Sequence, residues 1–162
     1  MRKCFPLYSI AWLLLLATAC TDTTTIDTPK EVTKAKLLQL VNEARSKGCT
    51  CGTIPYPPAP LLTWNNLLEA AAQAHSEEMN TSNQLTHRGN NGSNPGDRLE
   101  QVGYSWSAYG ENIAEGYTSE EEVVKGWIES VGHCKNIMDP SFTEMGVATS
   151  GSYWTQVFGA PR

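Results

Sequence analysis

The segment MGVATSGSYWTQVFG, residues 145–159, decides the fold class of this 162-residue chain. Met145, Val147 and Thr149 occupy alternate positions, and a second alternating run covers residues 153–158. This period of two predicts two strands, joined by a turn at Ser150-Gly151-Ser152. Helical patterns precede the strands, and no strand-helix-strand repeat is present. We therefore expect an α+β domain with helices stacked on a small, mainly antiparallel sheet.

The first half of the chain carries two helical signals. One begins at Thr28-Pro29-Lys30-Glu31, with a capping hydroxyl and a first-turn proline, and is expected to end at Gly48. Thr63 is expected to cap the second helix, whose face includes His75 and is rich in alanine. Residues 49–60 hold four prolines and are expected to form a long connecting loop.

Two further helices are expected before the strands. Asn94-Pro95-Gly96-Asp97 combines a cap, a proline and an acidic third position, so a short helix is predicted to run to Gly103. Ser119 and three glutamates open another helix. Its expected buried face comprises Val123, Val124, Trp127, Ile128 and Val131.

The N-terminus is expected to direct export. Arg2 and Lys3 precede an apolar run at residues 10–16 and a small-residue cleavage site, so residues 1–19 are predicted to be a signal peptide. The apolar run is far shorter than the roughly 20 residues of a membrane-spanning helix. The polar sequence TDTTTIDT follows and has too few apolar residues to fold by itself.

Cys20 directly follows Ala-Thr-Ala, which resembles the lipobox of bacterial lipoproteins. Residues 20–33 are therefore expected to be a lipidated N-terminus and tether, and residues 34–162 the folded domain. The lipid would make the membrane a partner and place the protein in the cell envelope, at the outer membrane of a Gram-negative host. The alternative is a secreted protein without lipid.

The charge of the chain argues against one class of partner. The chain has 12 basic and 17 acidic residues, for a net charge of -5. Its lysines and arginines are scattered, without the basic stripe that tracks a phosphate backbone. We therefore expect no binding to nucleic acid.

Several motifs occur together in order: LTHRGNNGSNPGDRL at 85–99, YGENIAEGY at 109–117, VVKGWIESVGHCKNIMDPSFTEMGVA at 123–148 and YWTQVFG at 153–159. They resemble the bacterial branch of the CAP superfamily of cysteine-rich secretory, antigen 5 and pathogenesis-related proteins, also called SCP domains. The resemblance covers roughly residues 34–160. It implies a three-layer α-β-α sandwich.

The resemblance also implies a cleft with two histidines and two glutamates. His87, Glu111 and His133 match three of these positions. In eukaryotic members the second glutamate lies three residues after the helix tryptophan, where this chain has Ser130. Glu129 is the substitute candidate, although neighbouring helix positions point about 100° apart.

The matched residues offer two candidate functions. His87 and His133, with Glu111, form a set that can bind a divalent metal such as zinc and leave coordination positions open. The first hypothesis is a module that binds a lipid, glycan, metal or protein ligand. It is favoured over catalysis because the chain lacks a clear fourth acid and a nucleophile with an adjacent base. The second is a metal-dependent hydrolase of peptidase type.

The cysteines allow at most one bridge inside the exported domain. Once Cys4 leaves with the signal peptide and Cys20 carries lipid, Cys49, Cys51 and Cys134 remain. Similar bacterial family members imply a Cys51–Cys134 bridge. The rival is Cys49–Cys134, while a Cys49–Cys51 bridge would be strained.

Overall fold

A computed structural model describes the backbone of residues 29–162 and the side chains from Thr33 onward. Cys4, Cys20 and the expected signal peptide lie outside the described residues. Within the described part of the chain, no helix is both long enough and apolar enough to cross a bilayer.

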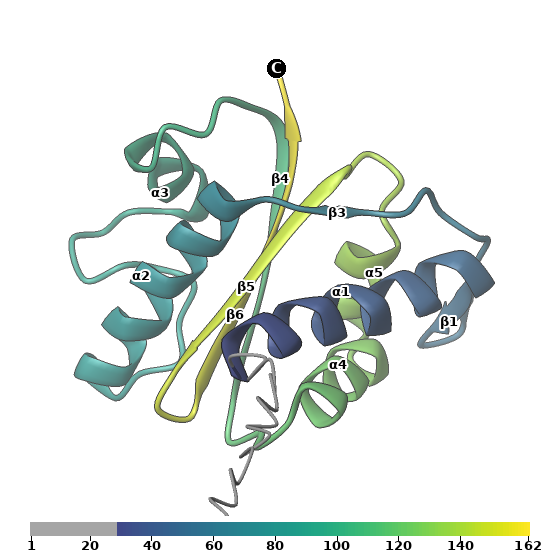
Figure 1. The fold of residues 1–162 in the computed structure, drawn as a ribbon, viewed down its shortest axis with the longest axis horizontal. Coiled ribbons are helices and arrows are strands. Elements are labelled where there is room, and N and C mark those ends of the chain that lie inside the picture. The colour runs from purple at the N-terminus through teal and green to yellow at the C-terminus, as the bar shows by residue number, and fades with distance from the viewer. Residues whose placement is uncertain (1–28) are drawn as a thin grey trace, which may run out of the picture.

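The centre of the molecule is a four-stranded sheet in the order β3-β5-β6-β4 (Figure 1). Its strands are β3 (Thr63–Trp64), β4 (Trp106–Glu115), β5 (Glu144–Ser150) and β6 (Tyr153–Pro161). The β4–β6 and β5–β6 pairs are antiparallel, and only the short β3 runs parallel to β5. The predicted hairpin is confirmed, since Ser150 pairs with Tyr153 across its turn.

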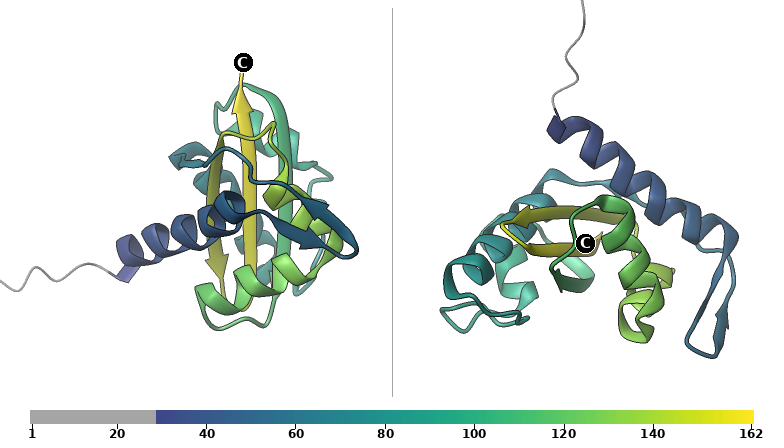
Figure 2. Two further views of the ribbon diagram at one scale, coloured as in Figure 1. Left: turned by 90° about the vertical axis from the view of Figure 1, so that its right-hand side faces the viewer. Right: turned by 90° about the horizontal axis from the view of Figure 1, so that it is seen from below.

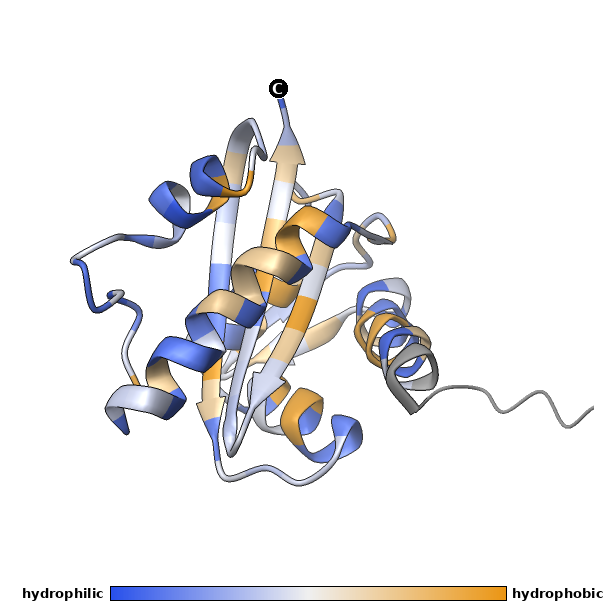
Figure 3. Cartoon of the chain, turned by 60° about the vertical axis from the view of Figure 1, so that its left-hand side comes forward, coloured by the Kyte–Doolittle hydropathy of each residue, from blue (hydrophilic) through white to orange (hydrophobic). Residues whose placement is uncertain are grey.

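Helices cover the sheet on both sides and form the expected α-β-α layers (Figure 2). One layer holds α2 (Asn66–Ser82) and α3 (Pro95–Gln101). The other holds α1 (Pro29–Lys47), α4 (Glu120–Glu129) and α5 (Val131–Met138). Figure 3 shows hydrophobic residues along the strands, with hydrophobic and hydrophilic positions alternating along the helix in front of them. Two principal buried clusters result, one under each helical layer.

Several predicted helix boundaries are confirmed. Gly48 follows α1 and has φ +73°, a conformation that suits a glycine ending a helix. Asn94 and Asp97 form the expected capping box of α3, and the Ser119 side chain caps α4. Because α1 begins at Pro29, the last five residues of the expected tether, 29–33, belong to this helix.

Other boundaries differ from the sequence predictions. Thr63 does not cap α2; it pairs with Glu144 in the sheet. Asn65 is the cap, because its side chain accepts hydrogen bonds from the backbone N–H groups of Leu67 and Leu68. Val131 is not part of the α4 face: the helix ends before it, and its side chain is largely exposed.

Residues 49–60 are not entirely loop. They contain an antiparallel ribbon of β1 (Cys49–Cys51) and β2 (Ile54–Tyr56), separate from the main sheet. Pro55 is tolerated because a two-stranded ribbon has free edges. The turn contains Gly52, whose φ of +66° suits a tight hairpin.

Arg45 ties α1 to the rest of the domain although its side chain is fully buried. Its guanidinium donates to the backbone carbonyls of Pro60, Ile137, Asp139 and Phe142 at 2.6 to 3.2 Å. Burial lowers the pKa of this guanidinium. These bonds join α1, the proline-rich segment and the end of α5.

Candidate functional site

Glu111 lies at the centre of the candidate site, on the edge strand β4. The preceding Gly110 leaves room for Phe142, since an added Cβ would lie 2.8 Å from the Phe142 ring. Only 2% of the Glu111 side chain is exposed. A buried carboxylate requires a compensating partner, and this one has Arg98 of α3, whose Nη2 lies 2.6 Å from Glu111 Oε2.

His87 uses the other oxygen of Glu111. Its Nδ1 lies 2.8 Å from Glu111 Oε1, while 55% of the His87 side chain is exposed. A carboxylate oxygen accepts, so the neutral ring carries its proton on Nδ1 and keeps a lone pair on Nε2. Arg98 also donates to the backbone carbonyl of His87 at 3.1 Å. The arginine and the glutamate together fix the loop that carries His87.

His75 is a buried neighbour of this network. Its Nε2 lies 2.7 Å from the carbonyl oxygen of Thr86 and 3.9 Å from Glu111 Oε1. Its Nδ1 lies 3.3 Å from Glu78. His75 is fully buried, and its contact with Thr86 holds the chain next to His87.

His133 approaches from the other helical layer, on α5. Asn112 follows Glu111 on β4, and neighbouring side chains of a strand point to opposite faces. The Asn112 side chain donates to the His133 carbonyl at 3.2 Å and to Gln156 at 3.0 Å. Asn136 of α5 donates to the Asn112 side chain at 2.9 Å. This amide network holds the start of α5 against β4.

The imidazoles of His87 and His133 interact electrostatically. Burial lowers the pKa of His133, and the nearby His87 lowers it further because two positive rings repel. Both effects favour a neutral His133 ring at neutral pH. A neutral imidazole can donate a lone pair to a metal ion or accept a hydrogen bond from a ligand.

The structure links only part of the matched set. His87 and Glu111 share a hydrogen bond, and His133 lies within electrostatic range of His87. Glu129 lies outside this network: it pairs with Lys125 at 3.8 Å and lines a groove between α1 and α4. Sequence reasoning missed Arg98, which stands inside the LTHRGNNGSNPGDRL motif but can be recognised as a partner of Glu111 only in the fold.

Among the described residues, the group of three potential ligand atoms that lie close together consists of cysteines, but two of them share a disulfide and cannot act as thiolate ligands. The ligand atoms of Cys49, Cys51 and Cys134 all lie within 4.8 Å of one another. Within this part of the chain, His87, Glu111 and His133 do not form such a group. Glu111 accepts the hydrogen bond of His87 Nδ1, and in the described part of the chain no third ligand atom lies close enough to His87 and His133 to complete a metal group with them.

The implied disulfide is confirmed. Cys51 of β1 is bonded to Cys134 of α5, and both residues are fully buried. Cys49 is free. The bridge attaches the β1–β2 ribbon to α5 directly beside His133.

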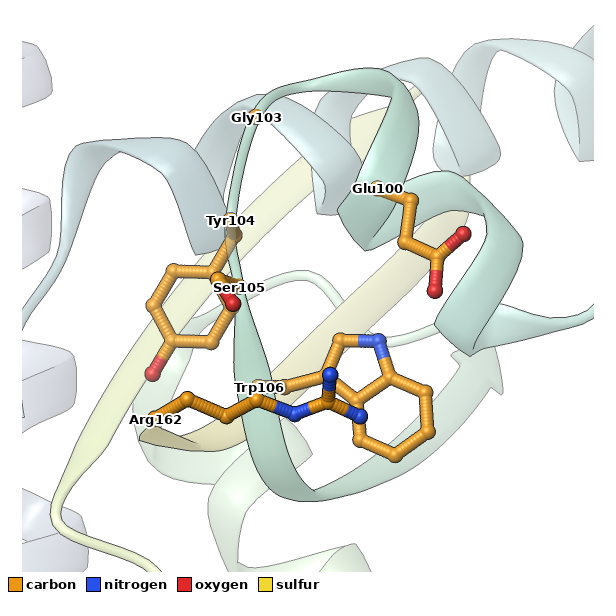
Figure 4. Close-up of a pocket in the computed structure, with 6 residues that line it drawn as sticks. All are labelled: Glu100, Gly103, Tyr104, Ser105, Trp106 and Arg162. Atoms are coloured by element: carbon orange, nitrogen blue, oxygen red, sulfur yellow. The ribbon is translucent and has the colours of Figure 1, made fainter.

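A separate pocket of about 310 Å³ lies beside the start of β4 (Figure 4). It is lined by Glu100, Gly103, Tyr104, Ser105, Trp106 and Arg162. The guanidinium of Arg162 lies over the Trp106 ring, 5.6 Å from its centroid. Burial, together with a hydrogen bond to Glu144, raises the pKa of Tyr104. These residues are distinct from the His87–Glu111 network.

Comparison with known proteins shows which family the chain belongs to. The model of the cysteine-rich secretory protein family, CAP, matches residues 38–158. The chain belongs to the CAP family. Two Bacillus subtilis proteins resemble this CAP chain: YkwD is 38% identical over 146 residues, and the membrane protein YlbC is 34% identical over 97 residues. These matches cover 88% and 60% of this chain, but only 53% of YkwD and 28% of YlbC.

Solved structures share the CAP fold. An extracellular SCP-domain protein from Bacillus anthracis has a TM-score of 0.70 and 28% identity, covering 82% of this chain and 43% of that one. An outer surface protein of Borrelia burgdorferi has a TM-score of 0.69 and 20% identity, covering 85% of this chain and 97% of that one. The expected CAP-type α+β fold is thereby confirmed.

Proposed function

We propose that this CAP protein is exported by its N-terminal signal, is anchored in the cell envelope by a lipid on Cys20, and binds a ligand at the site of His87, Glu111 and His133. We propose a divalent cation such as zinc as one component of that ligand, because imidazole nitrogens are donors that zinc accepts. A lipid, glycan or protein would then bind above the imidazoles. The two functions, anchoring and binding, reside in different parts of the chain and can be tested separately.

Export is supported by the signal-like residues 1–19 and by the relatives. The Bacillus anthracis neighbour is an extracellular protein, and the Borrelia neighbour is an outer surface protein. Metabolic labelling of the full chain with a radioactive fatty acid tests the anchor. Label on the wild-type chain and its loss in Cys20→Ser are expected. An unlabelled wild-type chain, or label that persists in Cys20→Ser, would contradict lipidation at this cysteine.

The His87–Glu111 hydrogen bond is the observation that carries the binding role. It directs the lone pair of His87 away from the buried carboxylate and toward solvent, the arrangement found behind histidines that ligate metals. The donor set of two imidazoles suits zinc, which takes nitrogen ligands and keeps remaining positions for water or another ligand. When bound, the ion would act as a Lewis acid.

Ligand binding is favoured over hydrolysis because Glu111, the candidate general base, already accepts hydrogen bonds from His87 and Arg98. One oxygen of Glu111 receives the Arg98 guanidinium and the other receives His87. With both oxygens already accepting hydrogen bonds and only 2% of the side chain exposed, this carboxylate is poorly placed to take a proton from a water molecule, as general base catalysis requires. Glu129 is exposed beside Lys125 and lines the groove between α1 and α4, outside the His87–Glu111 network. These contacts favour ligand binding over catalysis as the role of the proposed site.

Isothermal titration with zinc chloride tests the binding role. Wild-type protein is expected to bind zinc, and His87→Ala and His133→Ala to lose that binding while their thermal transitions remain cooperative. Glu129→Gln is the matched control and is expected to bind like wild type. Equal zinc binding by wild type and both histidine variants would overturn the proposed site.

A further inference from the structure

Outside the proposed binding site, the sulfur atoms of Cys49, Cys51 and Cys134 lie close together between β1 and α5. Cys49 and Cys51 are two residues apart on one strand, so their side chains point to the same side. Both face Cys134. The Sγ atom of Cys49 lies 3.4 Å from Cys134 Sγ and 3.9 Å from Cys51 Sγ. A free thiol thus lies in contact with the protein's own disulfide.

The three cysteines differ in their access to solvent. Cys51 and Cys134 are fully buried, so an external thiol cannot reach their bridge directly. Cys49 is partly exposed. It lies at the first position of β1, in a ribbon that is not hydrogen-bonded to the main sheet. Cys49 therefore connects the buried bridge with the surface.

We propose that these cysteines form a thiol–disulfide exchange site in which Cys49 attacks Cys134 and the bridge passes between Cys51–Cys134 and Cys49–Cys134. Cys49 gives its proton to solvent, and its thiolate forms a bond to Cys134 Sγ. The bond between Cys134 and Cys51 breaks, its electron pair stays on Cys51, and Cys51 takes a proton from solvent. One disulfide and one thiol exist before and after, so no oxidant or reductant is consumed.

Cys134 is the favoured target for two reasons. It is the nearer sulfur, and attack on Cys51 instead would create a strained bridge between residues 49 and 51. The released Cys51 thiol would stay in an apolar site, which a free cysteine tolerates well.

The resting geometry keeps the exchange slow. Cys49 Sγ lies 3.4 Å from Cys134 Sγ and 3.9 Å from Cys51 Sγ, so it lies beside their bond, whereas attack proceeds in line with that bond. Rotation of the Cys49 side chain, or a shift of the β1–β2 ribbon, has to bring it into line. Burial also raises the pKa of the Cys49 thiol, which lowers the thiolate fraction.

Disulfide mapping of the full chain tests the proposal. Cys4→Ser and Cys20→Ser are introduced so that only residues 49, 51 and 134 contribute sulfur chemistry. The oxidised protein is incubated at mildly alkaline pH, quenched and unfolded in acid, treated with N-ethylmaleimide to block its free thiol, and then digested without reduction. Because residues 48–87 contain no lysine or arginine, trypsin leaves Cys49 and Cys51 in one peptide, and fragment ions must locate the bridge.

Both bridge isomers are expected in this protein, and complete loss of the second isomer is expected when Cys49→Ser is added. Finding only the Cys51–Cys134 bridge after prolonged incubation would overturn the proposal.

A second variant tests whether the alternative bridge fits the fold. Cys51→Ser, in the same background, is expected to form Cys49–Cys134 and contain no free thiol. Two free thiols in a folded, air-oxidised Cys51→Ser chain would contradict the proposed geometry. If this variant does not fold, the isomer mapping of the protein with all three cysteines still decides the question.

Discussion

Nδ1 of His87 lies 2.8 Å from Oε1 of Glu111, and this bond joins an exposed imidazole to a buried carboxylate. The carboxylate is neutralised from behind by Arg98, which is itself nearly buried. The chain thus holds a histidine ring by one nitrogen and leaves the other free. The predictions concerning the cleft follow from this relationship.

Removing the charge of Glu111 is expected to weaken zinc binding. Glu111→Gln keeps the size of the side chain but leaves one accepting oxygen for the two donors His87 and Arg98, so one of them faces an NH2 group. Loss of such an orienting partner typically costs about 10- to 100-fold in metal affinity. Isothermal titration measures this change, and an affinity equal to that of wild type would show that Glu111 does not orient the ligand.

Removing the Arg98 cation is expected to destabilise the domain. Arg98→Met would leave the Glu111 carboxylate buried without its counter-ion, which typically costs about 3–5 kcal/mol in the free energy of unfolding. Urea denaturation measures the loss. The double variant Arg98→Met with Glu111→Gln should recover part of it, because the uncompensated charge is gone. A double variant as unstable as the sum of both single changes would argue against this pairing.

His133 is expected to make the fold sensitive to mild acid. Its pKa in the folded chain lies below the ordinary value of 6.5, owing to burial and then His87. Well above pH 6.5, His133 is neutral in both the folded and the unfolded chain, so it contributes nothing to the pH dependence of stability. As the pH falls through 6.5, His133 of the unfolded chain takes up a proton before His133 of the folded chain does. The free energy of unfolding therefore decreases with falling pH.

The free energy of unfolding, measured between about pH 7.5 and pH 5, should therefore decline less steeply in His133→Gln than in wild type. Identical slopes would show that the environment of His133 does not disfavour its charged form.

Arg45 is expected to be among the most sensitive structural positions. Arg45→Met retains the apolar length of the side chain but leaves the carbonyls of Pro60, Ile137 and Phe142 without their donor. Each unsatisfied buried acceptor costs about 1–3 kcal/mol, so the total loss should be several kcal/mol. Thermal denaturation of Arg45→Met beside the surface control Lys47→Met separates this effect from loss of charge alone.

The sequence predicted the elements whose signals are local. Two such elements are the turn between Ser150 and Tyr153 and the capping box of Asn94 and Asp97. Both depend only on neighbouring residues, and both are found as expected. Strand β4 was not predicted, because Glu111 and Asn112 break the alternation of apolar and polar residues. That strand buries both polar side chains, and their partners come from other elements.

The site residues that were recognised lie in sequence motifs, and those that were missed are defined by contacts in the fold. His87, Glu111 and His133 were found by family resemblance, whereas Arg98 and Arg45 act through contacts with other elements that only the fold brings together. The choice between Cys49 and Cys51 was open in the sequence because both point to the same side of one strand. The bridge uses Cys51, yet the rival sulfur lies only 3.4 Å from Cys134.

Nitrogen NMR of the imidazole rings during a zinc titration tests the central claim most directly. The account predicts that zinc shifts the Nε2 resonance of His87 and a nitrogen of His133, while Nδ1 of His87 keeps its proton on the Glu111 side. His75, which is buried and bonded to Thr86, should keep both resonances. Zinc binding that leaves His87 and His133 unchanged, or that displaces the Nδ1 proton of His87, would contradict the account.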